Sequence, residues 1–301
     1  MRKSIHLLIL KRPRGRFGRQ LFEARQDREH PFPKSAESPY FLYRSDAELK
    51  AHSSYSAAKS GSTEAAIRLI GDVALPLIAK LREEDFPSSC IYVAPHALEA
   101  QGENAIPQVL AMYLHHVLDG EVDESIVQTT KVFHTGADPM ERINLRARFS
   151  GYVVRGGRYV LVDDVTTMGG TLAELANYIQ AQRGDVVAAI VLVCAGRSGR
   201  LVAPRKVILE LERRYGDEIR KIFGIAAHAL TADEAGYLIG FRTVDEIRNR
   251  RAKAEQETYL RLGSKGIQLD ESEGQVGNVG SQRRPQESNK VPSRTRKPRL
   301  K

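Results

Sequence analysis

The stretch that decides the fold is Tyr159-Val160-Leu161-Val162-Asp163-Asp164-Val165-Thr166-Thr167-Met168-Gly169-Gly170-Thr171, followed by an Ala/Leu/Glu-rich segment from Leu172 to Gln182. Its apolar, β-branched beginning is typical of a strand buried on both faces of a parallel sheet. Two carboxylates close this strand, a turn of small residues runs from Thr166 to Thr171, and the last segment favours a helix. The sequence therefore predicts a strand, a turn and a helix of an α/β domain.

The predicted turn is a candidate phosphate site. Backbone N–H groups at the start of a helix converge on one spot, and the helix dipole adds positive potential there. Gly169 and Gly170 let an anion approach the backbone, and the hydroxyls of Thr167 and Thr171 are further donors. The two aspartates at the strand end are placed to bind vicinal sugar hydroxyls or a divalent cation. A phosphate, a diol and a metal together describe a ribose 5-phosphate.

The stretch from Val160 to Thr171 resembles the 5-phosphoribosyl-1-pyrophosphate (PRPP) motif of type I phosphoribosyltransferases, in which a hydrophobic strand runs into two acids and a Thr/Gly loop. Met168 stands where that family usually has Thr. The resemblance implies an α/β fold with a parallel sheet flanked by helices, and Mg²⁺ as a cofactor with the two aspartates as its ligands. The implied PRPP-binding residues are Asp163, Asp164, Val165, Thr166, Thr167, Met168, Gly169, Gly170 and Thr171. A generic strand–turn–helix whose acids only cap the helix is the plainer alternative.

Two further regions resemble the competence-protein-F (ComF-like) branch of that superfamily. The first runs from Tyr92 to Leu118 and includes a strand end, a loop with His96, Gly102 and Asn104, and a helix beginning at Pro107. In type I phosphoribosyltransferases a loop in this place grips the pyrophosphate. The residues to which the resemblance gives that role are Pro95, His96, Ala97 and Leu98.

The second region runs from Lys131 to Phe149, just before the motif strand. In related enzymes it forms a flap over the pyrophosphate, which implies Lys131, His134 and Arg142 as the cations of that flap. Lys131 and Arg142 thus join Asp163 and Asp164 as the expected catalytic residues. For Arg142 a solvated helix face remains the alternative, and for His134 a structural role.

Composition excludes several classes of protein. The chain has 301 residues, of which 42% are hydrophobic, enough for a sizeable core. Cys90 and Cys194 lie in apolar runs and are expected to be buried thiols in a reducing cytosol rather than a disulfide or a zinc site. No apolar run is long enough to span a bilayer, and the apolar stretch near the N-terminus lacks a cleavage site, so we expect a cytoplasmic protein without a membrane partner.

The chain divides by composition into four parts. These are an N-terminal extension (1–39), a phosphoribosyltransferase-like core (40–200), a helical appendage (201–262) and a disordered basic tail (263–301). The net charge is +9, and residues 271–301 hold eight Lys/Arg against three Glu, a surplus of five. Nucleic acid is therefore a candidate partner for the tail, and also for the helix–turn–helix-like piece from Thr231 to Lys253. A plain helical appendage or the arm of a homodimer is the alternative for that piece.

Three local patterns complete the prediction. A short strand is expected over Tyr40 to Tyr43. Apolar residues at helical spacing predict a helix over Thr63 to Leu81, capped by Ser62 or Thr63. Thr231, with Glu234 three residues later, forms a capping-box pattern that predicts the start of another helix.

These observations favour a phosphoribosyltransferase that uses PRPP and Mg²⁺ to transfer phosphoribose to a nitrogenous base and releases pyrophosphate. One alternative is a protein of the same fold that binds PRPP or a nucleotide without turnover, as a regulator or in DNA uptake or processing. Another is an unrelated domain that binds a sugar phosphate. The sequence does not indicate which base is the acceptor.

Overall fold

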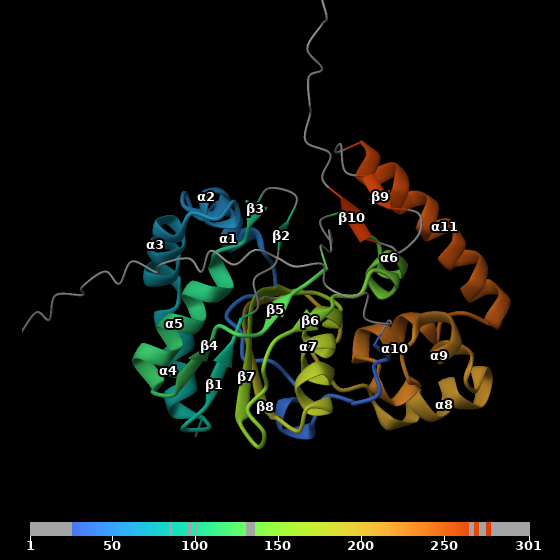
Figure 1. Ribbon diagram of the computed structural model, residues 1–301, viewed down its shortest axis with the longest axis horizontal. Coiled ribbons are helices and arrows are strands. Elements are labelled where there is room, and N and C mark those ends of the chain that lie inside the picture. The colour runs from blue at the N-terminus through green and yellow to red at the C-terminus, as the bar shows by residue number, and fades with distance from the viewer. Residues whose placement is uncertain are drawn as a thin grey trace, which may run out of the picture.

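A parallel sheet forms the centre of the protein. The computed structural model describes residues 26–84, 86–94, 98–99, 102–130, 136–264, 268–270 and 275–277 (Figure 1). The central strands are β1 (Ile91–Val93), β4 (Glu121–Asp123), β7 (Arg158–Thr166) and β8 (Asp185–Cys194). They lie in the order β4-β1-β7-β8, and every neighbouring pair is parallel. The predicted α/β class with a parallel sheet is confirmed.

Strand β7 is an inner strand of this sheet, and its Val160 lies opposite Tyr92 of β1 and Ala188 of β8. Successive side chains of a strand point to opposite faces of the sheet. Accordingly, Val160 belongs to the core on one face and Leu161 to the core on the other. An inner strand with helices on both faces needs apolar residues at every such position, which explains the uninterrupted apolar run in the sequence.

Helices cover both faces of the sheet (Figure 1). One core is built with apolar residues of α1 (Ala47–Ala51), α2 (Tyr55–Lys59), α3 (Thr63–Val73), α4 (Leu75–Glu83) and α5 (Ile106–Leu118). The core on the opposite face is built with residues of α7 (Gly170–Ala181) and of the short 3-10 helix η1 (Lys34–Ala36). The sheet is therefore the middle layer of three.

A third core lies beyond α7 and unites five helices. They are α6 (Pro139–Asn144), α8 (Arg205–Tyr215), α9 (Glu218–Phe223), α10 (Ala232–Leu238) and α11 (Val244–Gly263). Met140 and Ile143 of α6 pack there with residues such as Phe223 and Ile247. The helical C-terminal region expected from the sequence is confirmed, and its core includes the helix that precedes the motif strand.

Short elements complete the fold. A second 3-10 helix, η2, spans Ala227–Ala229. Three antiparallel pairs are formed by β2 (Leu98–Glu99) with β3 (Gly102–Glu103), β5 (Val127–Gln128) with β6 (Phe149–Ser150), and β9 (Gln268–Asp270) with β10 (Gln275–Gly277). Strands β9 and β10 lie within the tail that the sequence predicts to be disordered. The rest of that tail after Ser264, and residues 1–25 of the N-terminal extension, lie outside the described residues.

The strand expected over Tyr40 to Tyr43 is absent from this described part of the chain. Only isolated parallel bridges form there, from Tyr40 to Ile190 and from Tyr43 to Val193. The N–H groups of Leu42 and Tyr43 both donate to the carbonyl oxygen of Leu192, at 3.1 and 3.0 Å. Because two consecutive donors share one acceptor, the regular ladder of a strand is interrupted.

The helix expected over Thr63 to Leu81 is divided into α3 and α4 at Ala74. Pro76 lies in the first turn of α4. Proline has no N–H to donate and its ring clashes with the preceding turn, so a helix tolerates it only near its start. The cap at the beginning of α3 is confirmed, because the side chain of Ser62 accepts from the N–H of Ala65.

Cys90 and Cys194 are free and buried, as the sequence predicts. Burial raises the pKa of both thiols, which keeps them in the protonated and less reactive form. In the part of the chain that the structure describes, no helix is long and apolar enough to cross a membrane.

Candidate functional site

The turn between β7 and α7 is tighter than the sequence predicts. Strand β7 continues through both aspartates to Thr166, and α7 begins at Gly170, so only Thr167 to Gly169 make the turn. Gly169 has a φ of 77°, a left-handed conformation that glycine adopts without steric cost. Among the described residues, no side chain caps α7. Its first N–H groups are thus left as donors for another acceptor.

One side of this turn is packed and the other is accessible. A Cβ on Gly169 would meet Cδ2 of Leu201 at 2.8 Å and Cγ2 of Thr231 at 3.4 Å, so the back of the turn is filled. Gly169 itself is buried, whereas Thr167, Gly170 and Thr171 are partly exposed. The turn therefore has a firm support behind it and an open side in front, as a binding loop requires.

Arg142 reaches this turn from α6. Its Nη1 donates to Oγ1 of Thr167 at 3.0 Å, and its Nε donates to the carbonyl oxygen of Ala137 at 3.0 Å. Burial and the nearby charge of Arg261 lower the pKa of Arg142. The structure thus brings this predicted cation to the predicted phosphate turn. The other two predicted flap cations, Lys131 and His134, lie outside the described residues.

Helix α6 is held in place by α11. The side chain of Asp138 caps α6 and also pairs with Arg250 of α11. Glu141 accepts from the hydroxyl of Thr258 at 2.7 Å and from Nε of Arg261 at 3.1 Å. Burial alone would raise the pKa of Asp138, but the backbone N–H groups it accepts from and the Arg250 charge lower it below its ordinary value. These contacts fix the helix that carries Arg142.

The two aspartates of the motif have different surroundings. Asp164 is only 3% exposed, and its Oδ2 lies 2.9 Å from Nζ of Lys59, at the end of α2. Burial would raise the pKa of Asp164, but the Lys59 charge and hydrogen bonds, one of them with Asn104, lower it. Asp163 is half-buried, and burial together with the charge of Asp164 raises its pKa. Asp163 is therefore the more accessible acid, and Asp164 is held as an ion by the protein.

The acid pair is a candidate site for Mg²⁺. No group of three or more His, Cys, Asp or Glu side chains among the described residues could hold a metal ion. Mg²⁺ commonly binds through one or two carboxylates together with phosphate oxygens of a substrate. The half-buried carboxylate of Asp163 fits that mode, whereas Asp164 is already paired with Lys59.

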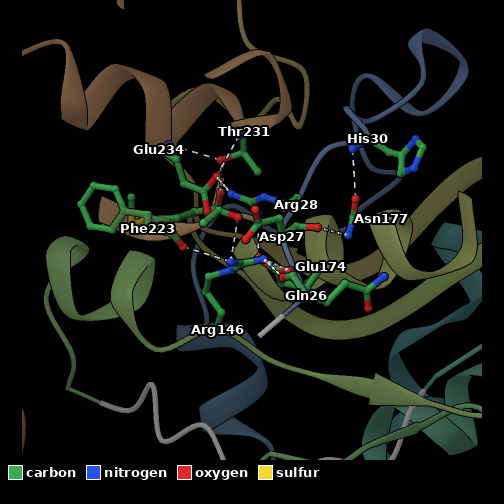
Figure 2. A network of polar contacts seen from close by, with 12 residues as sticks. Gln26, Asp27, Arg28, His30, Arg146, Glu174, Asn177, Phe223, Thr231 and Glu234 are labelled. Atoms are coloured by element: carbon green, nitrogen blue, oxygen red, sulfur yellow. Dashed lines mark hydrogen bonds and ion pairs between the residues drawn. The ribbon is translucent and has the colours of Figure 1, made fainter. Parts of the chain in front are cut away.

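Behind the turn, a buried network joins distant parts of the chain (Figure 2). Arg28 is fully buried; its Nη2 donates to Glu234 of α10 at 2.5 Å, and its Nη1 lies 3.5 Å from Glu174 of α7. Glu174 also accepts from Nε and Nη2 of Arg146, at 2.5 and 2.7 Å. The segment that includes Arg28, the motif helix and α10 are thus locked together.

Some residues of this site carry no recognisable signal in the sequence. Lys59 ends a short helix, and nothing near it in the sequence points to an aspartate. Thr231 and Glu234 were recognised as a capping box but assigned to an appendage, although they lie against the turn. Of the predicted pyrophosphate loop, residues 95–97 lie outside the described residues, and Leu98 begins β2.

Arg248 and Arg251 of the helix–turn–helix-like piece are engaged within the protein. Arg248 pairs with Asp245 at 2.9 Å and with Glu218 at 2.5 Å. Arg251 donates to Oδ1 of Asn144 at 2.9 Å and to the carbonyl oxygen of Ile222 at 3.1 Å. These contacts link α11 to α9 and α6, and they reduce the positive charge that this piece presents to a nucleic acid.

Comparison with protein-family models finds no match. Among curated proteins, the chain is similar to Protein TraN of Escherichia coli, with 37% identity over 218 residues, which cover 70% of this chain and 48% of that protein. It is also similar to an uncharacterized protein of Haemophilus influenzae, with 38% identity over 133 residues, or 44% of this chain and 30% of that protein. The chain therefore spans about half the length of the first relative and about a third of the second.

Two solved structures are also similar to this chain. One is an adenine phosphoribosyltransferase from Leishmania donovani, with 15% identity and a TM-score of 0.30 over 65% of this chain and 78% of that one. The other is a purine phosphoribosyltransferase from Pyrococcus horikoshii Ot3, with 18% identity and a TM-score of 0.23 over 45% of this chain and 87% of that one. Likenesses at these scores carry no argument, so the function is inferred from the site itself.

Proposed function

We propose that this protein is a phosphoribosyltransferase of type I, a glycosyltransferase that binds PRPP and transfers its phosphoribose to a nitrogenous base. The observation that carries the proposal is the start of α7, which no described side chain caps, at the carboxyl end of an inner parallel strand, with Arg142 bound to Thr167 of the turn. Ligands of open α/β sheets lie beyond the carboxyl ends of the strands. The resemblance of Val160 to Thr171 to the PRPP motif agrees with this placement.

In this proposal the 5-phosphate is bound by the turn. The first N–H groups of α7 and the hydroxyls of Thr167 and Thr171 donate to its oxygens, and the helix dipole favours its negative charge. Asp163 accepts from a ribose hydroxyl, because it is the more exposed acid of the pair. Asp164 keeps the strand end in place through Lys59.

The reaction is substitution at the anomeric carbon. A nitrogen atom of the base forms a bond to C1, the bond from C1 to the pyrophosphate oxygen breaks, and pyrophosphate leaves with the electron pair. The chain contributes by positioning the reactants, and Arg142 adds positive charge at the turn that binds the 5-phosphate. Asp163 would hold Mg²⁺, which would supply positive charge to the phosphate oxygens of the substrate.

The first test is binding of PRPP, measured by isothermal titration calorimetry, together with pyrophosphate release in the presence of purine, pyrimidine and pyridine bases. Arg142→Gln should weaken PRPP binding about tenfold or more, because a charged donor is lost. Arg213 lies on an exposed face of α8 and pairs with Glu210, so Arg213→Gln is the matched control and should bind as the wild type does. A wild-type protein that binds neither PRPP nor ribose 5-phosphate would overturn the proposal.

A second candidate is a protein that binds PRPP or a nucleotide without turnover. It is favoured by the burial of Asp164 and its pairing with Lys59, which leave a single accessible acid in the pair. PRPP binding that Asp163→Asn abolishes, with no pyrophosphate release for any base, would establish this alternative. We further propose a second copy of the chain or a nucleic acid as a partner, a cytoplasmic location and membership of the ComF-like branch.

A further inference from the structure

The N-terminus of α10 lies directly against the phosphate turn. The hydroxyl of Thr231 accepts from the N–H of Glu234 at 3.2 Å, which caps α10. The same hydroxyl donates to the carbonyl oxygen of Met168 at 2.6 Å. Met168 is the middle residue of the turn, so a single side chain joins the start of α10 to the turn before α7.

The next residues of α10 extend this contact. Oδ1 of Asp233 accepts from the N–H of Ser198 at 2.8 Å, in the loop that follows β8. A Cβ on Gly196 of that loop would meet Oδ2 of Asp233 at 2.5 Å and the carbonyl oxygen of Thr167 at 2.3 Å. The first turn of α10 therefore bridges the ends of β7 and β8, where the proposed ligand lies.

Glu234 brings a carboxylate close to the proposed phosphate. Its Oε1 would lie 3.1 Å from a Cβ on Gly170, the first residue of α7. An unpaired carboxylate at this place would repel an anion. Arg28, fully buried, donates to the Oε2 of Glu234 and offsets its charge (Figure 2). The arrangement thus keeps the start of α7 attractive to a phosphate.

The hydrogen bond from Thr231 to the Met168 carbonyl also sets the direction of the Gly169 N–H, because both groups belong to the same peptide. A trans peptide is planar, and its C=O and N–H point to opposite sides. With the Met168 carbonyl held toward Thr231, the N–H of Gly169 points away from α10. The accessible side of the turn is the side that Thr231 does not fill.

Building on the proposed function, we propose that α10 is part of the phosphate site and that Thr231 is its positioning residue. Thr231 fixes the Met168 carbonyl so that the N–H groups of the turn face the 5-phosphate of the ligand, and Arg28 cancels the charge of Glu234 behind it. Ligand binding then requires the C-terminal helical region, because the phosphate site is incomplete without it.

The chain offers a matched control for Thr231. Thr243 caps α11 in the same way, by accepting from the N–H of Glu246 at 3.2 Å, but it lies away from the turn. Thr231→Val and Thr243→Val each remove one cap, and both should lower the melting temperature, Thr231→Val by more because Thr231 is fully buried whereas Thr243 is exposed. Only Thr231→Val also removes the hydrogen bond to Met168.

Binding of ribose 5-phosphate and of PRPP to the full chain is measured by calorimetry. Thr231→Val should weaken both about tenfold or more, Thr243→Val should change them less than about twofold, and Thr231→Ser should restore wild-type binding. If Thr231→Val binds with wild-type affinity, or if Thr243→Val loses as much affinity as Thr231→Val, the role of Thr231 is overturned but the proposed function is not. A wild-type chain that binds neither compound would overturn the proposed function with it.

A second measurement needs no variant. In the wild-type protein, the amide proton and nitrogen resonances of Gly169 should move strongly on addition of ribose 5-phosphate, because its N–H becomes a donor to a charged oxygen. If the ligand binds and the Gly169 resonance stays in place, the proposed role of Thr231 is wrong.

Discussion

The N-termini of helices α7 and α10 lie against each other, and they differ in whether a side chain caps their first N–H groups. Helix α10 begins with a capping box, in which Thr231 and Glu234 each accept a backbone N–H of the other. Helix α7 begins after a left-handed glycine, without a capping side chain among the described residues. A capped start satisfies its own donors and stabilises the fold. An uncapped start leaves its N–H groups available to a ligand. In the proposed site, α10 therefore contributes to stability and α7 to binding.

The contrast extends to α6. Helix α6 also begins with a capping box, formed by Asp138 and Glu141, and α11 begins with the Thr243 cap. Helix α6 brings Arg142 to the turn and Thr231 joins α10 to it, while α11 holds α6 in place. The first N–H groups of α7 can therefore lack a capping side chain, because the neighbouring helices are stabilised by caps of their own.

The largest expected effect comes from removing the capping box at the N-terminus of α10. Glu234→Ala removes the hydrogen-bonding partner of the buried Arg28 and one half of the α10 capping box. Arg28 then keeps only part of its counter-charge, from Glu174 at 3.5 Å, so the free energy of unfolding should fall by about 3–5 kcal/mol in urea titrations. Glu246→Ala is the control, because Glu246 is exposed and its carboxylate accepts from the backbone N–H of Arg242, just before α11. A loss in Glu234→Ala as small as in this control would contradict the role of Arg28.

A smaller effect is expected from filling the uncapped start. Gly169→Ala adds a Cβ in a left-handed conformation and against Leu201, at 2.8 Å. The conformation costs about 1–2 kcal/mol and the overpacking about 1–3 kcal/mol, so a total loss of roughly 2–5 kcal/mol is expected in urea titrations. Gly156 has a φ of 71° and no atom within 4 Å of such a Cβ, so Gly156→Ala isolates the conformational part. Equal losses in the two variants would show that the back of the turn is not packed.

The smallest effect concerns the charge in the α6 cap. Asp138→Asn keeps a capping side chain but removes the carboxylate that pairs with Arg250, which should cost roughly 1 kcal/mol at pH 7. The pKa of Asp138 lies below its ordinary value in the folded protein, so its ionised form stabilises the fold above about pH 4. This contribution is lost as the pH falls through the folded pKa. Urea titrations from pH 7 to pH 2.5 should show the two proteins converging, and a constant gap would argue against the ion pair.

The strand, the turn and the motif helix could be predicted because their signals are local. The apolar run of β7, the Thr/Gly turn and the helix formers after it lie together in the sequence, and each agrees with the others. The same holds for the caps at Ser62 and Thr231, which need only a partner three residues away. The break at Ala74 carried a local signal as well, Pro76, which the helical spacing of the apolar residues concealed.

The partners of the site could not be predicted, because they come from distant segments. Nothing in the sequence near Lys59 shows that it faces Asp164, and nothing near Thr231 shows that it binds the Met168 carbonyl. The hydrogen bond between Arg28 and Glu234 joins residues 206 positions apart. Such pairs depend on how the three cores pack together, whereas the periodicity of the sequence indicates only the structure of single helices and strands.

The bond from Arg28 to Glu234 also has a consequence for synthesis. Arg28 leaves the ribosome long before its acceptor, which follows 206 residues later. At translation rates of about 5–20 residues per second, this delay is on the order of 10–40 s. During that time the buried guanidinium lacks the acceptor of its hydrogen bond, and the support behind the Thr167–Gly169 turn is incomplete. The nascent chain therefore completes the proposed binding loop only when the C-terminal helices have emerged.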